Sequence, residues 1–173
     1  MTRTDATLHT TVDSPIGELL VTGDGHAVTG LFMQDGLRPN TVSPHSTREP
    51  DAFDTVSTQL AEYFAGARTG FDVPLAPSGS AFQLRVWSAL REVPYGTTIS
   101  YGELARRIGQ PTASRAVGLA NGRNPISVII PCHRVIGADG NLTGYGGGIE
   151  RKELLLALEG CTLRRPDPLT LGL

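Results

Sequence analysis

The sequence predicts two small domains in one chain, a β-rich α/β domain followed by a mainly α-helical domain that contains a helix-turn-helix. Three observations predict this: short β-branched runs fill the first part of the chain, a stretch rich in proline, glycine and serine ends near residue 80, and closely spaced amphipathic segments follow. A chain of 173 residues with 39% hydrophobic residues can bury a core in each half. We expect an N-terminal domain over residues 1–77 and a C-terminal domain over residues 78–173.

The N-terminal domain should contain a three-stranded meander covered by one helix. The runs TLHTTV, GELLVTG and AVTGLFM are β-branched or alternating, and the turn sequences SPIG and GDGH separate them. The later segment DAFDTVSTQLAEYFAGA has the apolar spacing of a helix, with Asp51 as its expected cap and Gly66 near its end. The helix should cover the sheet with an apolar face made of Phe53, Val56, Leu60, Tyr63 and Phe64.

The C-terminal domain should begin with the helix AFQLRVWSALREV, capped by Ser80. Its buried face is expected to consist of Phe82, Val86, Trp87 and Leu90.

Two short helices should follow as a helix-turn-helix. Ser100 and Glu103 stand in the S-x-x-E relation of a reciprocal cap, which starts a helix over residues 101–108. Gly109 ends it, and a second helix over about residues 112–120 comes after a connection of a few residues.

The last part of the chain should contain one buried strand and one helix. The run ISVIIP is β-branched and apolar, which predicts a buried strand that ends at Pro131 and Cys132. The final helix, IERKELLLALEG, should stop at Gly160 and carry Glu159 in its last turn.

The net charge of −2 is divided unevenly between the halves. Residues 1–79 hold 4 Lys and Arg against 10 Asp and Glu, whereas residues 80–173 hold 11 against 7. A basic second half suggests a polyanionic partner. The sequence has no apolar run long enough for a membrane span and no apolar signal core, so we expect a cytoplasmic protein whose two cysteines are free thiols.

Cys132 lies between Pro131 and His133, at the end of the expected strand. A thiol needs a base or an electropositive setting to become a useful nucleophile. His133 is the nearest base, and Glu159 is the best candidate to orient its other ring nitrogen. The residues alone leave two other interpretations open: a buried core cysteine, and a cysteine hydrolase. Metal binding is disfavoured, because no second Cys or His lies at zinc-site spacing.

The second helix of the helix-turn-helix, TASRAVGLANG, is rich in small residues, with Arg115 as its main long side chain. A smooth face of this kind suits close approach to a shallow groove of DNA, although tight helix packing explains it equally well. The loop GYGGG is either a flexible turn or a backbone surface that approaches a ligand.

Together these motifs resemble those of the O6-alkylguanine-DNA alkyltransferases, also called methylated-DNA–protein-cysteine methyltransferases. The block NPISVIIPCHRVIG contains PCHRV, the acceptor-cysteine signature of that family. ISYGELA and RAVGLANGRNP precede it, and LTGYGGG and a helix ending in Glu159 follow, so the resemblance spans nearly the whole chain. It implies a ribonuclease-H-like α/β N-terminal domain and a mainly α C-terminal domain with a winged-helix-like DNA-binding unit.

The resemblance also implies roles for individual residues. Cys132 would be the alkyl acceptor, His133 its water-linked base and Glu159 the carboxylate that orients His133. Asn124 would hold the turn before the active-site segment. Tyr101 would donate its hydroxyl hydrogen to the guanine ring as guaninate leaves.

Further implied contacts concern the flipped base and the DNA. The backbone carbonyls of Cys132 and Val135 would accept hydrogen bonds from the exocyclic amine of guanine, and the loop at Tyr145 and Gly146 would line the alkyl pocket. Arg115 would enter the base stack in place of the extruded nucleotide. The small residues of its helix would let the helix enter the minor groove; they are Ala116, Gly118 and Ala120.

The implied activity is single-turnover DNA repair without a cofactor. O6-alkylguanine, chiefly O6-methylguanine with O4-methylthymine as a second substrate, would leave the duplex and pass its alkyl group irreversibly to Cys132. The implied partner is double-stranded DNA, bound by a monomer. Gly146 stands where some members have serine, so alkyl groups larger than methyl are expected to fit. Some members have an N-terminal zinc site built with cysteines, but no cysteine precedes Cys132 here, and we expect no bound metal.

Two other classes of function compete with this expectation. A damage-recognition module would bind alkylguanine without transferring the group, and the presence of Cys132 argues against it. A cysteine-dependent hydrolase would act through many turnovers per molecule.

Overall fold

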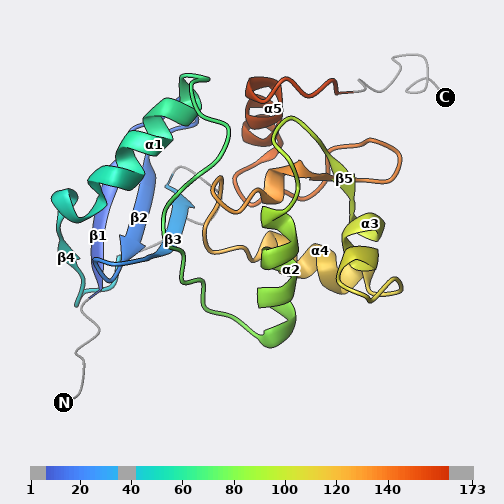
Figure 1. The fold of residues 1–173 in the computed structure, drawn as a ribbon, viewed down its shortest axis with the longest axis horizontal. Coiled ribbons are helices and arrows are strands. Elements are labelled where there is room, and N and C mark those ends of the chain that lie inside the picture. Colours follow the sequence, from blue (N-terminus) through green and yellow to red (C-terminus); the bar gives the residue numbers. More distant parts are fainter. Residues whose placement is uncertain (1–6, 35–41, 164–173) are drawn as a thin grey trace.

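The computed structural model describes residues 7–34 and 42–163. Its first half contains a sheet and one covering helix, and its second half, which lies beside the first, is mainly helical (Figure 1). This is the division into a small α/β part and a helical part that the sequence predicts. The first half consists of β1 (Leu8–Val12), β2 (Leu19–Gly23), β3 (Val28–Met33), β4 (Thr47–Arg48), the 3-10 turn η1 (Pro50–Phe53) and α1 (Asp54–Phe64).

The three predicted strands form the predicted meander. β1 pairs antiparallel with β2, and β2 pairs antiparallel with β3. A fourth strand, β4, was not predicted; it pairs parallel with β1 and completes the order β3-β2-β1-β4. β4 has two exposed residues, so it carries no alternating pattern that could reveal it.

Helix α1 covers the sheet as predicted, and its buried side includes Val56, Leu60 and Tyr63 (Figure 1). The expected cap at Asp51 is wrong. Pro50 starts a 3-10 turn before the helix, and the Asp54 backbone N–H donates to the backbone oxygen of Asp51. Asp51 therefore lies inside that turn, one turn upstream of the place where a capping side chain would act.

The open edge of β3 joins the two halves. At Val28, the backbone exchanges hydrogen bonds of 2.9 and 2.8 Å with residues 74 and 76 of the connection between the halves. At Leu31, it exchanges bonds of 2.9 and 3.1 Å with residues 125 and 127, just upstream of Cys132. These bonds satisfy backbone groups that an edge strand would otherwise leave unpaired. They also anchor the segment before the cysteine to the N-terminal sheet.

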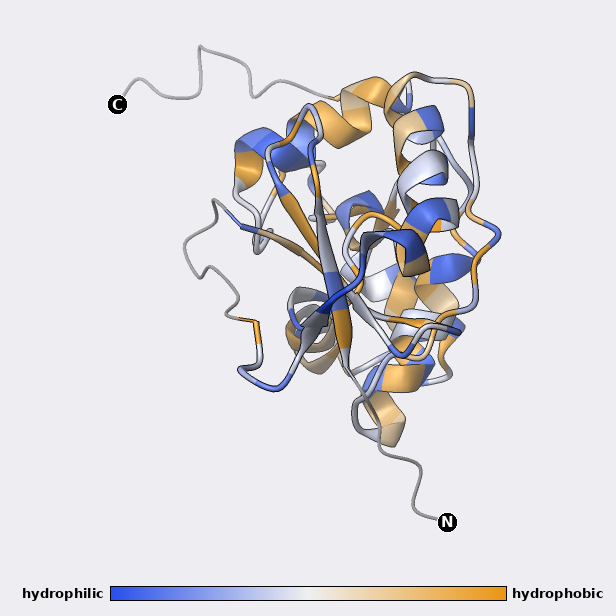
Figure 2. Ribbon diagram, turned by 90° about the vertical axis from the view of Figure 1, so that its left-hand side faces the viewer, coloured by the Kyte–Doolittle hydropathy of each residue, from blue (hydrophilic) through white to orange (hydrophobic). Residues whose placement is uncertain are grey.

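The second half keeps all the predicted helices, with shifted ends. Ser80 caps α2 as predicted, and Gln83 completes a reciprocal capping box with bonds of 3.2 and 2.9 Å. The helices of the second half bury one side and expose the other. Figure 2, viewed from the side of the first half, shows both hydrophilic and hydrophobic segments within the helices of the molecule. Within the described ranges, no helix is both long and apolar enough to cross a membrane. The elements are α2 (Ala81–Arg91), β5 (Ile99–Ser100), α3 (Tyr101–Arg107), α4 (Ser114–Gly122), η2 (Cys132–Arg134), β6 (Val135–Ile136) and α5 (Ile149–Leu158).

Helices α3 and α4 form the predicted helix-turn-helix, with two local corrections. Ser100 accepts a hydrogen bond from the Glu103 N–H at 3.1 Å, but the Glu103 carboxylate does not return it. That carboxylate instead pairs with Arg106 and Arg107 on the exposed side of α3. Helix α4 starts at Ser114, two residues later than predicted, and continues to Gly122.

Candidate active site

The segment from Asn124 to Pro131 is buried as predicted, but it is not a strand. Its backbone makes one isolated bridge, between Leu31 and Ile126, and then turns, with Val128 in the left-handed region at φ 70°. The side chain of Asn124 takes the place of a strand partner. It accepts from the Ile126 N–H at 3.0 Å and donates to the Ile130 carbonyl at 2.7 Å. A β-branched apolar run signals burial, and here a side-chain amide satisfies the backbone that a sheet would otherwise satisfy.

Asn124→Ala is expected to destabilise the protein by about 1–3 kcal/mol, because it leaves the buried Ile126 N–H without a partner and leaves the Ile130 carbonyl with the Cys132 N–H alone. The same change should slow alkyl transfer, since the turn that presents Cys132 loses its brace. Chemical denaturation and a transfer assay measure the two effects. Asn141→Ala is the matched control, because Asn141 bonds to Asp139 on the exposed surface and should change stability by less than about 0.5 kcal/mol. Equal effects of the two substitutions would contradict this role of Asn124.

Cys132 begins the 3-10 turn η2 and lies at the wall of a cavity of about 470 Å³. This is within the range of small-molecule sites. Cys132 is 4% exposed, and its backbone carbonyl accepts a hydrogen bond from the Asn121 side-chain amide at 3.3 Å. Tyr145 and Gly146, the predicted pocket residues, line the same cavity. The structure thus brings the candidate nucleophile and the glycine-rich loop together around one hollow.

Burial raises the pKa of the Cys132 thiol, while the Asn124 amide and the Lys152 ammonium oppose that rise. Burial also lowers the pKa of His133, although its hydrogen bond to Glu159 opposes the change. Both directions favour the neutral forms, a thiol beside an uncharged imidazole. In the resting protein the sulfur therefore carries its proton, and His133 is free to accept one.

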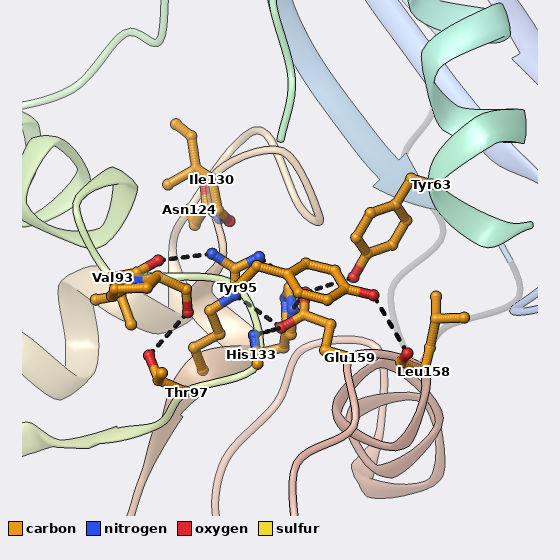
Figure 3. Close-up of polar contacts among 12 residues, drawn as sticks. Tyr63, Val93, Tyr95, Thr97, Asn124, Ile130, His133, Leu158 and Glu159 are labelled. Atoms are coloured by element: carbon orange, nitrogen blue, oxygen red, sulfur yellow. Dashed lines mark hydrogen bonds and ion pairs between the residues drawn. The ribbon is translucent and has the colours of Figure 1, made fainter. Parts of the chain in front are cut away.

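His133 and Glu159 meet as predicted. Nε2 of the imidazole lies 2.8 Å from Oε1 of the carboxylate, and both side chains are fully buried (Figure 3). Glu159 follows α5 as its C-cap, and Gly160 ends the helix in the left-handed region at φ 76°. The other ring nitrogen, Nδ1, is buried and has no hydrogen-bond partner within the described chain. The imidazole is thus held at one nitrogen by a carboxylate and has a second nitrogen available for a proton.

Three side chains donate hydrogen bonds to Glu159, and two of them were not predicted. Arg134 donates from Nε to Oε2 at 2.8 Å and from Nη2 to Oε1 at 2.9 Å, the bidentate geometry that binds a carboxylate most firmly. Tyr63 donates to Oε1 at 2.6 Å. Burial alone would raise the pKa of Glu159, but the donors His133, Arg134 and Tyr63 hold it well below its ordinary value. Glu159 is therefore a buried anion.

A short parallel pairing positions Tyr101 beside the loop that leads to the Cys132 cavity, outside the residues that line that cavity. β5 pairs with β6, so that Ser100 lies opposite Ile136, and α3 then begins at Tyr101. The Tyr101 hydroxyl donates to the Thr143 carbonyl at 3.2 Å. Tyr101 thus contacts the loop that leads to the cavity.

Lys152 is a buried cation near the site that the sequence analysis missed. It is 0% exposed, and its Nζ donates to the carbonyls of Val135 at 2.6 Å and Thr143 at 3.1 Å. Burial lowers the pKa of Lys152 to about 8, while Cys132 opposes the change. Val135 is the residue whose carbonyl was predicted to accept from guanine, so Lys152 helps to fix that carbonyl.

Helix α4 exposes two of the four residues predicted to contact DNA. Arg115 and Ala116 are exposed, and Gly118 is half-buried beside the ring of Tyr101. Ala120 is a correction to the predicted smooth face, because it is 3% exposed and its carbonyl accepts the Trp87 indole N–H at 2.9 Å. Its methyl group packs into the core. Leu119, which was not predicted, is 67% exposed on this helix.

In the described part of the chain, no three His, Cys, Asp or Glu side chains lie close enough together to hold a metal ion.

A buried cysteine at a cavity, an imidazole held by a carboxylate and an adjoining helix-turn-helix define a DNA-binding protein with a cysteine nucleophile. Comparisons with known proteins identify its family. Residues 7–77 match the ribonuclease-like domain of 6-O-methylguanine DNA methyltransferase, and residues 81–161 match the DNA-binding domain of the same family. The chain belongs to the O6-alkylguanine-DNA alkyltransferases.

Individual relatives are similar over nearly their whole length. The methylated-DNA–protein-cysteine methyltransferase of Mycobacterium bovis is 56% identical over 162 residues, which cover 93% of this chain and 96% of that protein. The protein of the same description from Methanosarcina acetivorans is 52% identical over 148 residues, which cover 86% and 95%. The structure of Mycobacterium tuberculosis OGT in complex with DNA has a TM-score of 0.83 and 56% identity, and covers 88% of this chain and 92% of that one.

Proposed function

We propose that this protein repairs DNA by transferring the alkyl group of O6-alkylguanine to Cys132, in a reaction that each molecule performs once. The observation that carries the proposal is the placement of Cys132 at a cavity beside the helix-turn-helix, with His133 and Glu159 joined at 2.8 Å behind it. The relatives described as methylated-DNA–protein-cysteine methyltransferases support the same activity. A cytoplasmic location and monomeric action remain predictions.

The chemistry is a displacement at the alkyl carbon. The Cys132 proton moves through one bridging water to Nδ1 of His133, which is buried and lacks another partner within the described chain. The sulfur then bonds to the alkyl carbon as the bond from that carbon to O6 breaks. Negative charge appears on the guanine, and the Tyr101 hydroxyl leaves the Thr143 carbonyl to donate to the ring. The guaninate then takes up one proton, and His133 releases the proton that it accepted, so that the products are a thioether on Cys132 and unmodified guanine.

The alkyl carbon is accessible to Cys132 only after the base has left the duplex. Extrusion costs a few kcal/mol, and Arg115 offsets part of this cost by occupying the vacated place in the stack. Arg115 and Ala116 lie on the exposed side of α4, as this step requires. The carbonyls of Cys132 and Val135 then receive the exocyclic amine of guanine. We also propose entry through the minor groove, since Ala116 and Gly118 leave part of α4 free of large side chains beside Arg115.

The test of the proposal is a count of turnovers. The protein is mixed with a tenfold excess of duplex DNA that contains one O6-methylguanine per duplex, and the repaired guanine is measured over time. We expect a single burst whose height equals the amount of active protein. Continued turnover would instead indicate a hydrolase, and tight binding without repair would indicate a recognition module.

The cavity should also accept alkyl groups larger than methyl. Gly146 lines it, and a Cβ added at Gly146 would meet no atom within 4 Å, so this part of the wall is open. We expect transfer of a benzyl group to Cys132 at a measurable rate, compared with methyl transfer in parallel single-turnover assays. Gly146→Ser should reduce the rate for benzyl more than the rate for methyl. A complete block of benzyl transfer in the unaltered protein would refute this prediction.

A further inference from the structure

Tyr63 connects the N-terminal half of the protein to the active-site carboxylate. It lies on α1, which covers the sheet, and its hydroxyl donates to Oε1 of Glu159 at 2.6 Å across 96 positions of sequence. The Tyr63 residue and the Glu159 side chain are both 0% exposed. Figure 3 shows the Tyr63 hydroxyl entering the group around Glu159 from the side of α1.

The tyrosine ring is held firmly, so its hydroxyl has a defined position. The Tyr63 ring packs at centroid distances of 5.3 Å from both Phe64 and Phe71 and 6.2 Å from Tyr95. These contacts involve the ring and not the hydroxyl. A phenylalanine at this position would keep the packing and lose the hydrogen bond alone.

The hydrogen bond of Tyr63 affects the same oxygen that His133 uses. Oε1 of Glu159 lies 2.8 Å from His133 Nε2, while Arg134 grips both oxygens of the carboxylate. Arg134 therefore suffices to set the plane of the carboxylate. What Tyr63 adds is a neutral donor that withdraws negative charge from Oε1, beside the imidazole.

We propose that Tyr63 is a positioning residue for alkyl transfer, which shares Oε1 of Glu159 with His133 and thereby keeps the imidazole neutral and ready to accept the Cys132 proton. This inference rests on the proposed function of the site. Through Tyr63, the N-terminal domain would affect the reaction by way of Glu159 and His133. The domain supplies a donor to the carboxylate that orients the base.

Removal of the Tyr63 hydroxyl would leave more negative charge on Oε1. A stronger anion stabilises the protonated imidazole, so the pKa of His133 rises. Protonated His133 cannot accept the thiol proton, and the acidic limb of the pH profile therefore moves to higher pH. The other titratable groups that face His133 and Glu159 are unchanged by the substitution; they are Tyr95, Cys132, Arg134, Tyr145, Lys152 and Cys161.

The experiment measures the pH dependence of Cys132 reactivity in Tyr63→Phe. Single-turnover transfer from O6-methylguanine DNA is followed at a series of pH values, and alkylation by iodoacetamide is followed in parallel on the tryptic peptide that contains Cys132. We expect the midpoint of the acidic limb to move up by about half a pH unit or more in both assays, which corresponds to about a threefold loss of rate on that limb. The iodoacetamide profile requires no DNA repair, so it tests the inference even if the proposed function fails.

Tyr95→Phe is the matched control. Tyr95 belongs to the same aromatic group, and its hydroxyl donates to the Leu158 carbonyl at 3.3 Å instead of to Glu159. Its loss should leave the midpoint within about 0.2 pH units of the unaltered protein. An unmoved midpoint in Tyr63→Phe, or an equal movement in Tyr95→Phe, would overturn the proposal.

Two further variants exclude a merely structural role and serve if Tyr63→Phe folds poorly in thermal unfolding. Replacement of Tyr63 by 3,5-difluorotyrosine makes the hydroxyl a stronger donor, so the midpoint should move to lower pH. In a Glu159→Gln background, Tyr63→Phe should produce no further shift, because the oxygen through which it acts no longer carries the charge. A shift in the same direction for both changes at Tyr63, or a full shift in the Glu159→Gln background, would contradict the proposal.

Discussion

Cys132→Ser is expected to reduce alkyl transfer by at least about a thousandfold, because a hydroxyl is a much weaker nucleophile than a thiol and His133 alone cannot activate it. The substitution replaces one atom in a residue that is 4% exposed, so it should leave the fold intact. Single-turnover repair of O6-methylguanine DNA measures the loss.

The same variant should still bind DNA with an affinity within about twofold of the unaltered protein, since Cys132 is 4% exposed and Arg115 and Ala116, the exposed residues expected to contact DNA, are unchanged. Cys161→Ser is the matched control. Cys161 is the other free cysteine of the described chain and is half-buried after α5. The Cys161→Ser variant should transfer the methyl group to Cys132 at the rate of the unaltered protein. Substantial methyl transfer by Cys132→Ser, or loss of transfer in Cys161→Ser, would show that Cys132 is not the alkyl acceptor.

Glu159→Gln is expected to lower both stability and activity. The carboxylate binds His133, Arg134 and Tyr63, and its loss leaves the Arg134 guanidinium buried without a counter-charge. Breaking a buried ion pair in this way costs about 3–5 kcal/mol. Transfer should fall by about a hundredfold or more, because the imidazole loses the group that orients it. Denaturant unfolding and single-turnover repair measure the two effects.

The stability effect should depend on pH in a defined direction. The pKa of Glu159 in the folded protein lies below the value of 4.5 for an ordinary glutamate, so the folded state favours the anion. Its contribution is fully present above pH 4.5 and is lost as the pH falls further toward the folded-state pKa. The stability difference between the unaltered protein and Glu159→Gln should therefore be largest near neutral pH and shrink below pH 4.5. A difference that stays constant from pH 7 to pH 3 would show that Glu159 acts through packing instead of charge.

The parts of the fold that could be predicted are those with a local pattern. The meander, the five α-helices and the stop at Gly160 follow from alternation, helical spacing and capping residues that neighbours in sequence supply. The pairing of His133 with Glu159 was also predicted, although the distance between them in sequence gave no geometric basis for it. The prediction of that pairing rests on the order of the motifs and on their resemblance to those of the alkyltransferase family.

The parts that could not be predicted depend on distant partners. The segment before Cys132 looks like a strand because it is apolar, but the amide of Asn124 satisfies its backbone in a turn. Lys152 lies among charged residues in IERKELLLALEG and resembles a surface lysine, yet the carbonyls of Val135 and Thr143 hold it inside. Tyr63 satisfies the helical pattern of a core residue, and nothing near it in sequence points to Glu159.

The most direct test of this account is the mass of the protein after one reaction. The protein is incubated with excess O6-methylguanine DNA, digested with trypsin and analysed by mass spectrometry. We expect one methyl group per chain, on the peptide that contains Cys132, in an amount equal to the guanine restored. Restored guanine with an unmodified Cys132, or a methyl group on Cys161 or elsewhere, would contradict the claim that Cys132 receives the alkyl group.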